Sequence, residues 1–267
     1  MKISIIVPTY KPQSYIWECL ASIRDQTFPK EDYELILVLN GCKEPYYTQI
    51  KNYINQNLLG YNINFIQTDI GGVSNARNIA LDEVKGEYVT FIDDDDYISP
   101  KYLEGLYEKA TPGKVTVARA IGFKDETRDI VKLFPSKELY EVQSTKSNLN
   151  IMEIRRRLNG PCSKLIHETL INNRRFNIEY KNGEDSLFCF LISDKMKNFA
   201  YASENAIYYR RYREGNATSQ LKGKYIIKNR VKLIVEYAKI IMRHPLRYNW
   251  FFFFSTVLAN IKTIIKK

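Results

Sequence analysis

Four consecutive carboxylates, Asp93 to Asp96, are the residues of this chain whose types and spacing point most directly to chemistry. They follow the apolar run Tyr88–Ile92 without a gap, as at the end of a buried strand that reaches the carboxyl edge of an α/β sheet, where ligands bind. Successive side chains of an extended chain alternate between faces, so Asp93 and Asp95 should point the same way. Carboxylates paired in this way suit a hard divalent cation, which takes oxygen ligands.

The same acids have a second, purely structural interpretation. Ser99 and Pro100 are typical of a helix start, and an acidic cluster before them would cap that helix. An EF-hand loop is not expected. The sixth position of such a loop must be glycine, but counted from Asp93 it is Ile98. The twelfth position must be glutamate, and Glu104 fulfils that requirement. The sequence leaves open whether the cluster binds a metal ion or caps a helix.

The segments around the acids alternate between strand and helix patterns. We expect strands at residues 3–7, 34–39, 63–67 and 88–92, and helices at residues 14–24, 45–59 and 74–84. Turn signals stand between them, at Asn40-Gly41 and at residues 69–72. This alternation predicts right-handed βαβ units, a mostly parallel sheet with flanking helices, and an α/β fold class.

The second half of the chain has a looser pattern. It predicts strands at residues 114–121, 129–134 and 206–210, and helices at residues 145–158, 163–172 and 184–194. A basic amphipathic helix follows at residues 222–243, with an apolar stripe made of Ile227, Val231, Ile234, Ala238 and Ile241. His244-Pro245 ends it, and a second helical pattern runs from the aromatic cluster at residues 250–254 to Lys267. The apolar stretch 250–259 is far shorter than the ~20 residues of a membrane-spanning helix.

The net charge of +10 is concentrated in the C-terminal tail. Residues 216–267 hold 11 of the 40 basic residues and one of the 30 acids, so the first 215 residues carry 29 of each and are neutral. A neutral body without a recognisable nucleic-acid module argues against nucleic acid as a partner. A basic helix with an aromatic cluster is typical of a helix lying on an anionic membrane surface. Packing on the body of the protein, or a homodimer interface, is the alternative.

Other sequence features predict a cytoplasmic protein. Met1-Lys2 leads straight into the short apolar run 3–7, which is not a signal peptide. The four cysteines form no CxxC pair and are expected to be reduced. Two scattered histidines are too few for a histidine-based zinc site. With the basic tail, these features predict a protein peripheral on the cytoplasmic face of the cell membrane.

Five short motifs occur in an order and spacing that resemble those of the inverting, metal-dependent GT-A glycosyltransferases, the large family-2 group. The resemblance spans residues 1–219, as a GT-A catalytic domain with a nucleotide-sugar-binding half at 1–110 and an acceptor-side half at 111–219. Residues 220–267 are then a basic helical appendage. The motifs are Ile5-Ile6-Val7-Pro8-Thr9-Tyr10, Ser22-Ile23-x-x-Gln26-Thr27, Asn75-Ala76-Arg77-Asn78, Phe91-Ile92-Asp93-Asp94-Asp95-Asp96 and Gly183-Glu184-Asp185-x-x-Phe188.

The resemblance implies a nucleotide-diphosphate sugar, with UDP as the expected nucleotide, in the crevice at the strand ends. Pro8, Thr9 and Tyr10 would line the nucleoside pocket, with Tyr10 stacked near the base. Asn40 stands where the family has an aspartate that reads the uracil edge, and an amide offers both a donor and an acceptor. Arg77 would contact the nucleotide from the first turn of a helix. On their own, these residues also fit a core-edge aromatic, an Asn-Gly turn and a surface arginine.

The same resemblance assigns roles to the acids. Asp93 would bind the ribose and help to hold Mn²⁺ or Mg²⁺, Asp95 would bind the metal directly, and Asp94 would lie on the nucleotide-sugar side. Asp185 is the candidate general base, which must take the proton of the acceptor hydroxyl. Glu184 beside it would lie on the acceptor side. Without the family, Glu184-Asp185 would be ordinary acidic residues at a helix N-terminus.

Basic residues complete the expected site. Arg210, Arg211 and Arg213 resemble the basic strip of the family's closing loop, and one of them would contact the diphosphate. Lys164 lies in the region of the family's acceptor-side Trp-x-Lys motif, although the tryptophan is missing.

The expected function is transfer of a sugar from a nucleotide-diphosphate sugar to a saccharide or lipid-linked saccharide acceptor, in surface polysaccharide or glycolipid synthesis. A catalytically inactive, membrane-associated scaffold with the same fold is the main alternative, although the chain keeps Asp93, Asp95 and Asp185 together. A sugar-phosphate nucleotidyltransferase would need a Gly-rich N-terminal loop, and a dinucleotide oxidoreductase a G-x-G-x-x-G motif after the first strand. Neither pattern is present.

Overall fold

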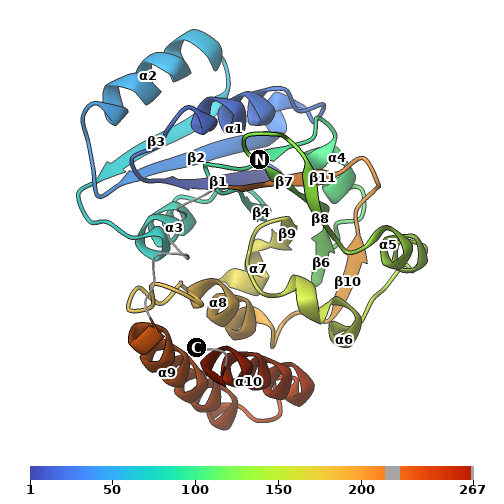
Figure 1. Ribbon diagram of the computed structural model, residues 1–267. Coiled ribbons are helices and arrows are strands. Elements are labelled where there is room, and N and C mark those ends of the chain that lie inside the picture. The colour runs from blue at the N-terminus through green and yellow to red at the C-terminus, as the bar shows by residue number, and fades with distance from the viewer. Residues whose placement is uncertain (214–222, 266–267) are drawn as a thin grey trace.

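Seven strands form the central sheet of this computed structural model, which describes residues 1–213 and 223–265 (Figure 1). The strand order is β10-β6-β9-β4-β1-β2-β3. The strands β1 (Ile3–Thr9), β2 (Tyr33–Asn40), β3 (Asn62–Thr68) and β4 (Tyr88–Phe91) run parallel, as predicted. On the other side lie β6 (Lys114–Val117), β9 (Lys164–His167) and β10 (Asn198–Tyr201), of which β9 runs antiparallel to both of its neighbours.

A smaller sheet extends one edge of the molecule. Its order is β5-β11-β7-β8, with bounds β5 (Tyr97–Ile98), β7 (Arg119–Lys124), β8 (Ile130–Phe134) and β11 (Ile207–Tyr212). The predicted strand at 114–121 is thus divided between β6 in the central sheet and β7 in the smaller one. Because β5 pairs with β11, the chain that follows the acidic cluster is tied to the arginine-rich strand.

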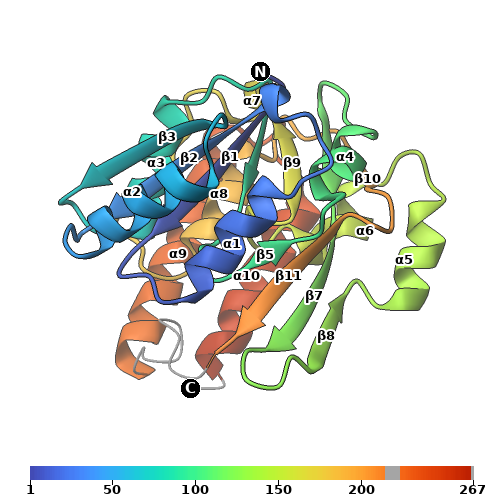
Figure 2. The same cartoon turned by 90° about the horizontal axis from the view of Figure 1, so that it is seen from above.

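Helices cover both faces of the central sheet because its strands are apolar on both sides. Ile5 and Val7 of β1 face the core that contains α1 (Tyr15–Arg24), α2 (Tyr46–Asn57) and α4 (Tyr102–Tyr107). Ile6 faces the opposite core, with α3 (Val73–Asp82) and α8 (Glu184–Ile192). Figure 2 shows α1 and α2 lying across the strands, and Figure 1 shows α8 on the other face.

Two predicted helices, at residues 163–172 and 145–158, are present only in part. Residues 164–167 form β9, because Leu165 and Ile166 are fully buried between β6 and β4, and a short apolar run fits an interior strand. The predicted helix at 145–158 is replaced by α5 (Lys137–Ser144), α6 (Ile151–Ile154) and the 3₁₀ turn η2 (Arg155–Arg157). The side chain of Ser136 caps the start of α5, and Asn150 forms a capping box with Glu153 that starts α6. Two further short elements are η1 (Lys30–Asp32) and α7 (Glu168–Ile171).

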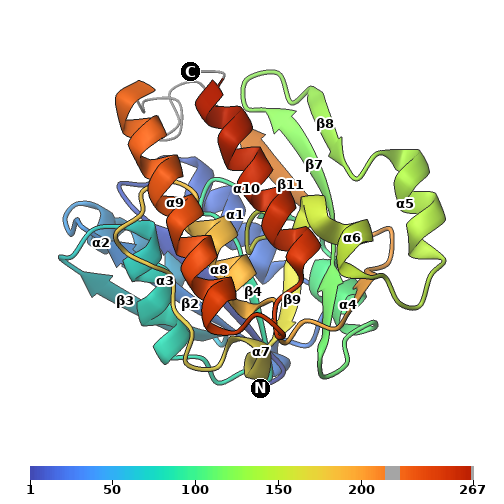
Figure 3. The ribbon, with the colours of Figure 1, turned by 90° about the horizontal axis from the view of Figure 1, so that it is seen from below.

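The C-terminal tail is a helical hairpin packed on α8, which is the alternative that the sequence left open. It consists of α9 (Gly223–Arg243) and α10 (Trp250–Ile265), seen side by side in Figure 3. Leu233, Tyr237 and Ile241 belong to the same core as α8. The predicted stripe is therefore partly wrong, because Ile227 and Val231 are 37% and 49% exposed. None of the described helices is long and apolar enough to cross a membrane.

Leu233 provides a direct test of this packing. Leu233→Ala should lower the free energy of unfolding by about 2–5 kcal/mol, because the side chain is fully buried and its loss leaves a cavity. The control, Leu246→Ala, should change the stability little, because Leu246 is 100% exposed. Urea denaturation measures both values. Equal effects of the two substitutions would show that the hairpin does not share the core in solution.

Candidate active site

Four strand-end loops meet at the carboxyl edge of the parallel strands, and the side chain of Asn40 ties three of them together. The amide Nδ2 donates to the carbonyl of Thr9, at 2.7 Å, and the Oδ1 accepts from the backbone N–H of Gly72, at 2.8 Å. Asn40 is only 3% exposed. The residue expected to read a base thus uses both halves of its amide inside the protein, where it fixes the loops after β1, β2 and β3.

Arg77 joins two of the predicted site residues. Its guanidinium donates to Asp185, at 2.5 Å from Nη1, and to Asp93, at 2.8 Å from Nη2. The Arg77 side chain is 3% exposed, whereas those of Asp93 and Asp185 are 41% and 31% exposed. The buried cation therefore holds one carboxylate of the acidic cluster and the candidate base at the rim of one site. In this arrangement Arg77 holds the two carboxylates in place, and its contact with a nucleotide stays a prediction.

Burial and charge together set the protonation of this ion triad. Burial alone would lower the pKa of Arg77, but Asp185 and then Asp93 raise it above its ordinary value. Burial raises the pKa of Asp185, and Arg77 opposes that rise only in part. A carboxylate whose pKa is raised in this way is a stronger base than an ordinary aspartate, which suits proton removal from a hydroxyl group.

The other acids of the cluster have different partners. Asp94 accepts a hydrogen bond from the Thr9 hydroxyl, at 2.5 Å, and burial raises the pKa of Asp94 to about 7. Asp95 accepts from Arg213, at 2.6 Å, and burial followed by the charge of Asp93 raises the pKa of Asp95. Asp96 is 3% exposed and accepts from the Tyr208 hydroxyl, at 2.6 Å, and from the backbone N–H of Arg211, at 2.8 Å. Asp96 thus anchors the acidic loop to β11.

The three predicted arginines of the β11 region have different environments. Arg211 is 6% exposed and donates to Glu18, to Asp125 and to the Asp95 carbonyl, so its guanidinium serves the fold. Arg213 donates to Asp95 and lies over the ring of Tyr15, with its guanidinium carbon 4.3 Å from the ring centroid. Arg210 is exposed. Arg210 and Arg213 are thus the better placed of the three for a diphosphate.

The two predicted acceptor-side residues, Lys164 and Glu184, are both buried. Lys164 is 2% exposed and donates to the carbonyls of Gly160, at 2.6 Å, and Cys162, at 3.0 Å. Burial lowers the pKa of Lys164 to about 8. The lysine therefore lies beneath the site and fixes the loop 160–162. Glu184 lies beside Asp185, and burial, followed by the charge of Asp185, raises the pKa of Glu184 to about 7.

Three residues that support the site, Tyr208, Glu18 and Asp125, belong to none of the sequence motifs. Tyr208 donates to Asp96 and accepts from the backbone N–H of Asp93, at 3.2 Å, so it supports the acidic loop from β11. Glu18 and Asp125 neutralise Arg211. The alternation of tyrosine and arginine in residues 208–213 was a signal for Tyr208. No local pattern marks Glu18 or Asp125, which are distant from Arg211 in sequence.

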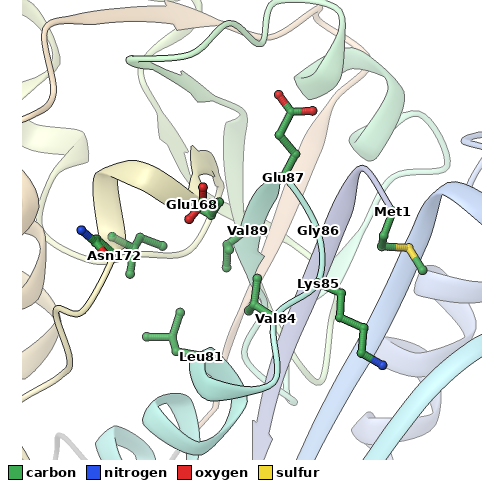
Figure 4. A pocket seen from close by; sticks show the side chains of 10 residues that line it. Met1, Leu81, Val84, Lys85, Gly86, Glu87, Val89, Glu168 and Asn172 are labelled. Atoms are coloured by element: carbon green, nitrogen blue, oxygen red, sulfur yellow. The ribbon is translucent and has the colours of Figure 1, made fainter.

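A cavity of about 430 Å³ lies at the opposite edge of the sheet, where β1 and β4 begin. Figure 4 shows Met1, Lys85, Glu87 and Glu168 among the side chains that line it. None of the motif residues lines this cavity. Among the described residues there is also no group of three or more His, Cys, Asp or Glu side chains that could by themselves hold a metal ion. We place the candidate site at the carboxyl edge, where Arg77, Asp93 and Asp185 meet.

The chain belongs to glycosyl transferase family 2, because the model of that family matches residues 4–180. It is 30% identical over 228 residues to the poly(ribitol-phosphate) beta-N-acetylglucosaminyltransferase TarS of Staphylococcus aureus, a match of 82% of this chain and 37% of TarS. It is 29% identical over 218 residues to the GalNAc(5)-diNAcBac-PP-undecaprenol beta-1,3-glucosyltransferase of Campylobacter jejuni, a match of 81% of this chain and 67% of that protein.

The fold agrees with this assignment. The crystal structure of Staphylococcus aureus TarS 1-349 in complex with UDP-GlcNAc superposes with a TM-score of 0.71 at 26% identity. The match covers 89% of this chain and 66% of that one. The fold is therefore the GT-A fold, as predicted. The chain spans just over a third of the length of TarS.

Removing the charge of Arg77 should be strongly destabilising. Arg77→Met leaves Asp93 and Asp185 without their counter-ion, and the expected loss in the free energy of unfolding is roughly 3–5 kcal/mol at neutral pH. The control is Arg24→Met, which breaks the ion pair with Asp25, whose side chain is 56% exposed, and should cost less than about 1 kcal/mol. Urea denaturation of both variants tests this difference. Similar losses would contradict the structural importance of the Arg77 bridge.

Proposed function

We propose that this protein is an inverting glycosyltransferase that transfers a sugar from a UDP-sugar to a saccharide or lipid-linked acceptor. The observation that carries the proposal is the Arg77 bridge, which brings a carboxylate of the strand-end acidic cluster and a separate carboxylate on α8 to one site. The relatives support it, since TarS is named for N-acetylglucosaminyl transfer and the Campylobacter jejuni protein for glucosyl transfer.

The donor would bind at the ends of β1 to β4. Tyr10 is 53% exposed and lies beside Gly41, where a Cβ atom would come within 3.3 Å of the tyrosine ring and 2.8 Å of the Gly71 Cα. Glycine at position 41 therefore lets the loops after β2 and β3 approach each other next to Tyr10. The exposed ring of Tyr10 can stack on a base. Pro8 and Thr9 support that loop, and UDP as the nucleotide follows the TarS complex with UDP-GlcNAc.

The acidic cluster fits a divalent cation. Asp93 and Asp95 are partly exposed at the same edge, and the charge of Asp93 raises the pKa of Asp95, a repulsion that a cation would relieve. Carboxylate oxygens are suitable ligands for Mn²⁺ or Mg²⁺. When bound, the ion would neutralise the charge that develops on the departing nucleoside diphosphate. Asp95 and Asp93 would hold it, while Arg213, now paired with Asp95, would be free to contact the diphosphate.

Asp185 would act as the general base. Its carboxylate takes the proton of the acceptor hydroxyl as that oxygen forms a bond to the anomeric carbon, on the face opposite the leaving group. The bond between the anomeric carbon and the diphosphate oxygen breaks, and its electron pair leaves with the UDP. Arg77 would keep Asp185 oriented and ionised until the proton is transferred.

Gly183 keeps the start of α8, which carries Asp185, close to α9, because a Cβ atom at Gly183 would lie 2.5 Å from Leu233 Cδ1.

The outer face of the hairpin supports a peripheral membrane location. α10 carries an exposed apolar row, made of Trp250, Phe254, Leu258, Ile261 and Ile265. Lys228, Lys232 and Lys239 are exposed on α9. Apolar and cationic side chains on one surface element favour binding to anionic lipid. A cytoplasmic enzyme with a lipid-linked acceptor would then work at the membrane surface.

Asp185→Asn tests the role of the base. The variant should bind UDP with the affinity of the wild type but transfer sugar about 10²–10⁴ times more slowly, because an amide cannot take the proton. Transfer from UDP-GlcNAc or UDP-glucose is followed as UDP release, and UDP binding by calorimetry. The matched control is Asp82→Asn, whose side chain is 63% exposed on α3 and should leave both values unchanged. Transfer by Asp185→Asn at nearly the wild-type rate would remove Asp185 as the base.

Vesicle sedimentation tests the membrane proposal. The protein should sediment with vesicles that contain phosphatidylglycerol and stay in solution with pure phosphatidylcholine. Leu258→Ser should weaken this binding several-fold by removing apolar contact area, whereas Leu59→Ser, at a residue 78% exposed on the body, should not. Binding that is the same for both lipids, or that does not respond to Leu258→Ser, would contradict the proposal.

A further inference from the structure

A second cavity, of about 450 Å³, lies between the start of α8 and the C-terminal hairpin. Glu184 and Asp185 line it from α8, Arg155 from η2, and Arg230 and Asn260 from α9 and α10. Figure 3 shows α9 and α10 lying across α8, with α6 beside them. The cavity therefore shares the candidate base with the active site. The family match ends at residue 180, so the walls from α8, α9 and α10 all lie beyond it.

Arg155 lines this cavity with neutral partners only. Its Nε donates to the Ser255 hydroxyl, its Nη2 to the Thr256 hydroxyl, both at 2.6 Å, and its Nη1 to the Asn159 amide oxygen, at 2.9 Å. The guanidinium also lies over the ring of Phe252, 4.6 Å from the centroid. No carboxylate among the described residues forms an ion pair with it. Its orientation is fixed, but its charge is not balanced.

Arg230 has the same character. Its Nη1 donates to the Asn260 amide oxygen, at 3.2 Å, and its Nη2 to that of Asn182, at 2.5 Å. Its Nε is buried and has no hydrogen-bond partner among the described residues, none of which forms an ion pair with Arg230. The buried guanidiniums of Arg77 and Arg211 are held by carboxylates, whereas Arg157, like Arg155 and Arg230, has neutral partners only among the described residues but does not line this cavity. An unbalanced, partly buried cation is costly unless an anion joins it.

We propose that Arg155 and Arg230 form a subsite that binds a phosphate group of the acceptor, beside the hydroxyl that Asp185 deprotonates. This inference rests on the proposed function, because it gives the acceptor of that reaction an anionic group. The planar fork of a guanidinium matches two phosphate oxygens, and two such forks line one cavity. The amide and hydroxyl groups of Asn159, Asn182 and Thr256 give the cavity further polar groups for a polyhydroxylated chain.

The two acids of the cavity are compatible with an anion. Asp185 forms an ion pair with Arg77, which it shares with Asp93, so its charge is partly compensated. Burial, together with the neighbouring Asp185, raises the pKa of Glu184 to about 7, so much of Glu184 is protonated at neutral pH. Its Oε2 is buried and has no hydrogen-bond partner among the described residues. A protonated Glu184 can donate a hydrogen bond to a phosphate oxygen.

The test measures binding of phosphate-bearing probes to the full chain by calorimetry, with and without UDP and Mn²⁺. The probes are a ribitol phosphate hexamer, a farnesyl diphosphate-linked GlcNAc and, as a neutral control, maltohexaose. The variants are Arg155→Gln and Arg230→Gln, with Arg243→Gln as the matched control because it removes the same charge from an exposed position on α9. Circular dichroism melting checks that each variant is folded.

The two cavity variants should bind at least one phosphate probe about tenfold more weakly, while Arg243→Gln binds it like the wild type. The probe that responds identifies the source of the phosphate, a polymer backbone or a lipid diphosphate. Arg230→Lys, which keeps the charge, should recover part of the affinity. Unchanged binding of both phosphate probes, an equal loss for maltohexaose, or no recovery in Arg230→Lys would overturn the subsite. Phosphate binding that depends on both arginines, without any sugar transfer, would instead overturn the proposed function and support the subsite.

Discussion

The organisation of this protein depends on one buried cation. Arg77 comes from α3, Asp93 from the loop after β4 and Asp185 from the start of α8, so three elements that are distant in sequence meet at one guanidinium. Because the arginine is almost fully buried, it cannot exchange these partners for water, and the two carboxylates are held in a fixed relation. A glycosyl transfer needs such a fixed arrangement, because the groups that bind the sugar donor and the base that deprotonates the acceptor must be held at the same two reacting atoms.

The remaining loops reinforce the same geometry with polar contacts that do not enter the chemistry. Asn40 holds the strand-end loops, and Asp96 with Tyr208 fastens the acidic loop to the smaller sheet. Each of these groups is buried and hydrogen-bonded, so each favours a single arrangement of the loops. The C-terminal hairpin plays a comparable part at the start of α8, where Leu233 packs against Gly183. Asp185, the proposed base, is thus held by Arg77 on one side and by the packing of α8 on α9 on the other.

Much of the site could be predicted because its residues follow local patterns. Asp93 and Asp95 end a β-prone run, and Asp185 starts a helix, so both positions can be located from short stretches of sequence. The roles of Asn40 and Arg77 could not be obtained in this way, because they depend on which distant loops approach them. The strand β9 was missed because Leu165-Ile166 fits a buried strand and a buried helix equally well. The buried face of α9 was partly misassigned because Ile227, Val231 and Leu233 are all apolar, and only packing distinguishes them.

The most direct test of the central claim is a thermal-shift panel of UDP, GDP, CDP and dTDP, each with Mn²⁺ or with EDTA. A ligand that binds only the folded state raises the melting temperature by mass action. We expect a clear rise with UDP and Mn²⁺, and little or none with UDP in EDTA. No rise with any nucleotide, or a rise with UDP that persists unchanged in EDTA, would contradict a metal-assisted nucleotide-sugar site at the strand-end acids.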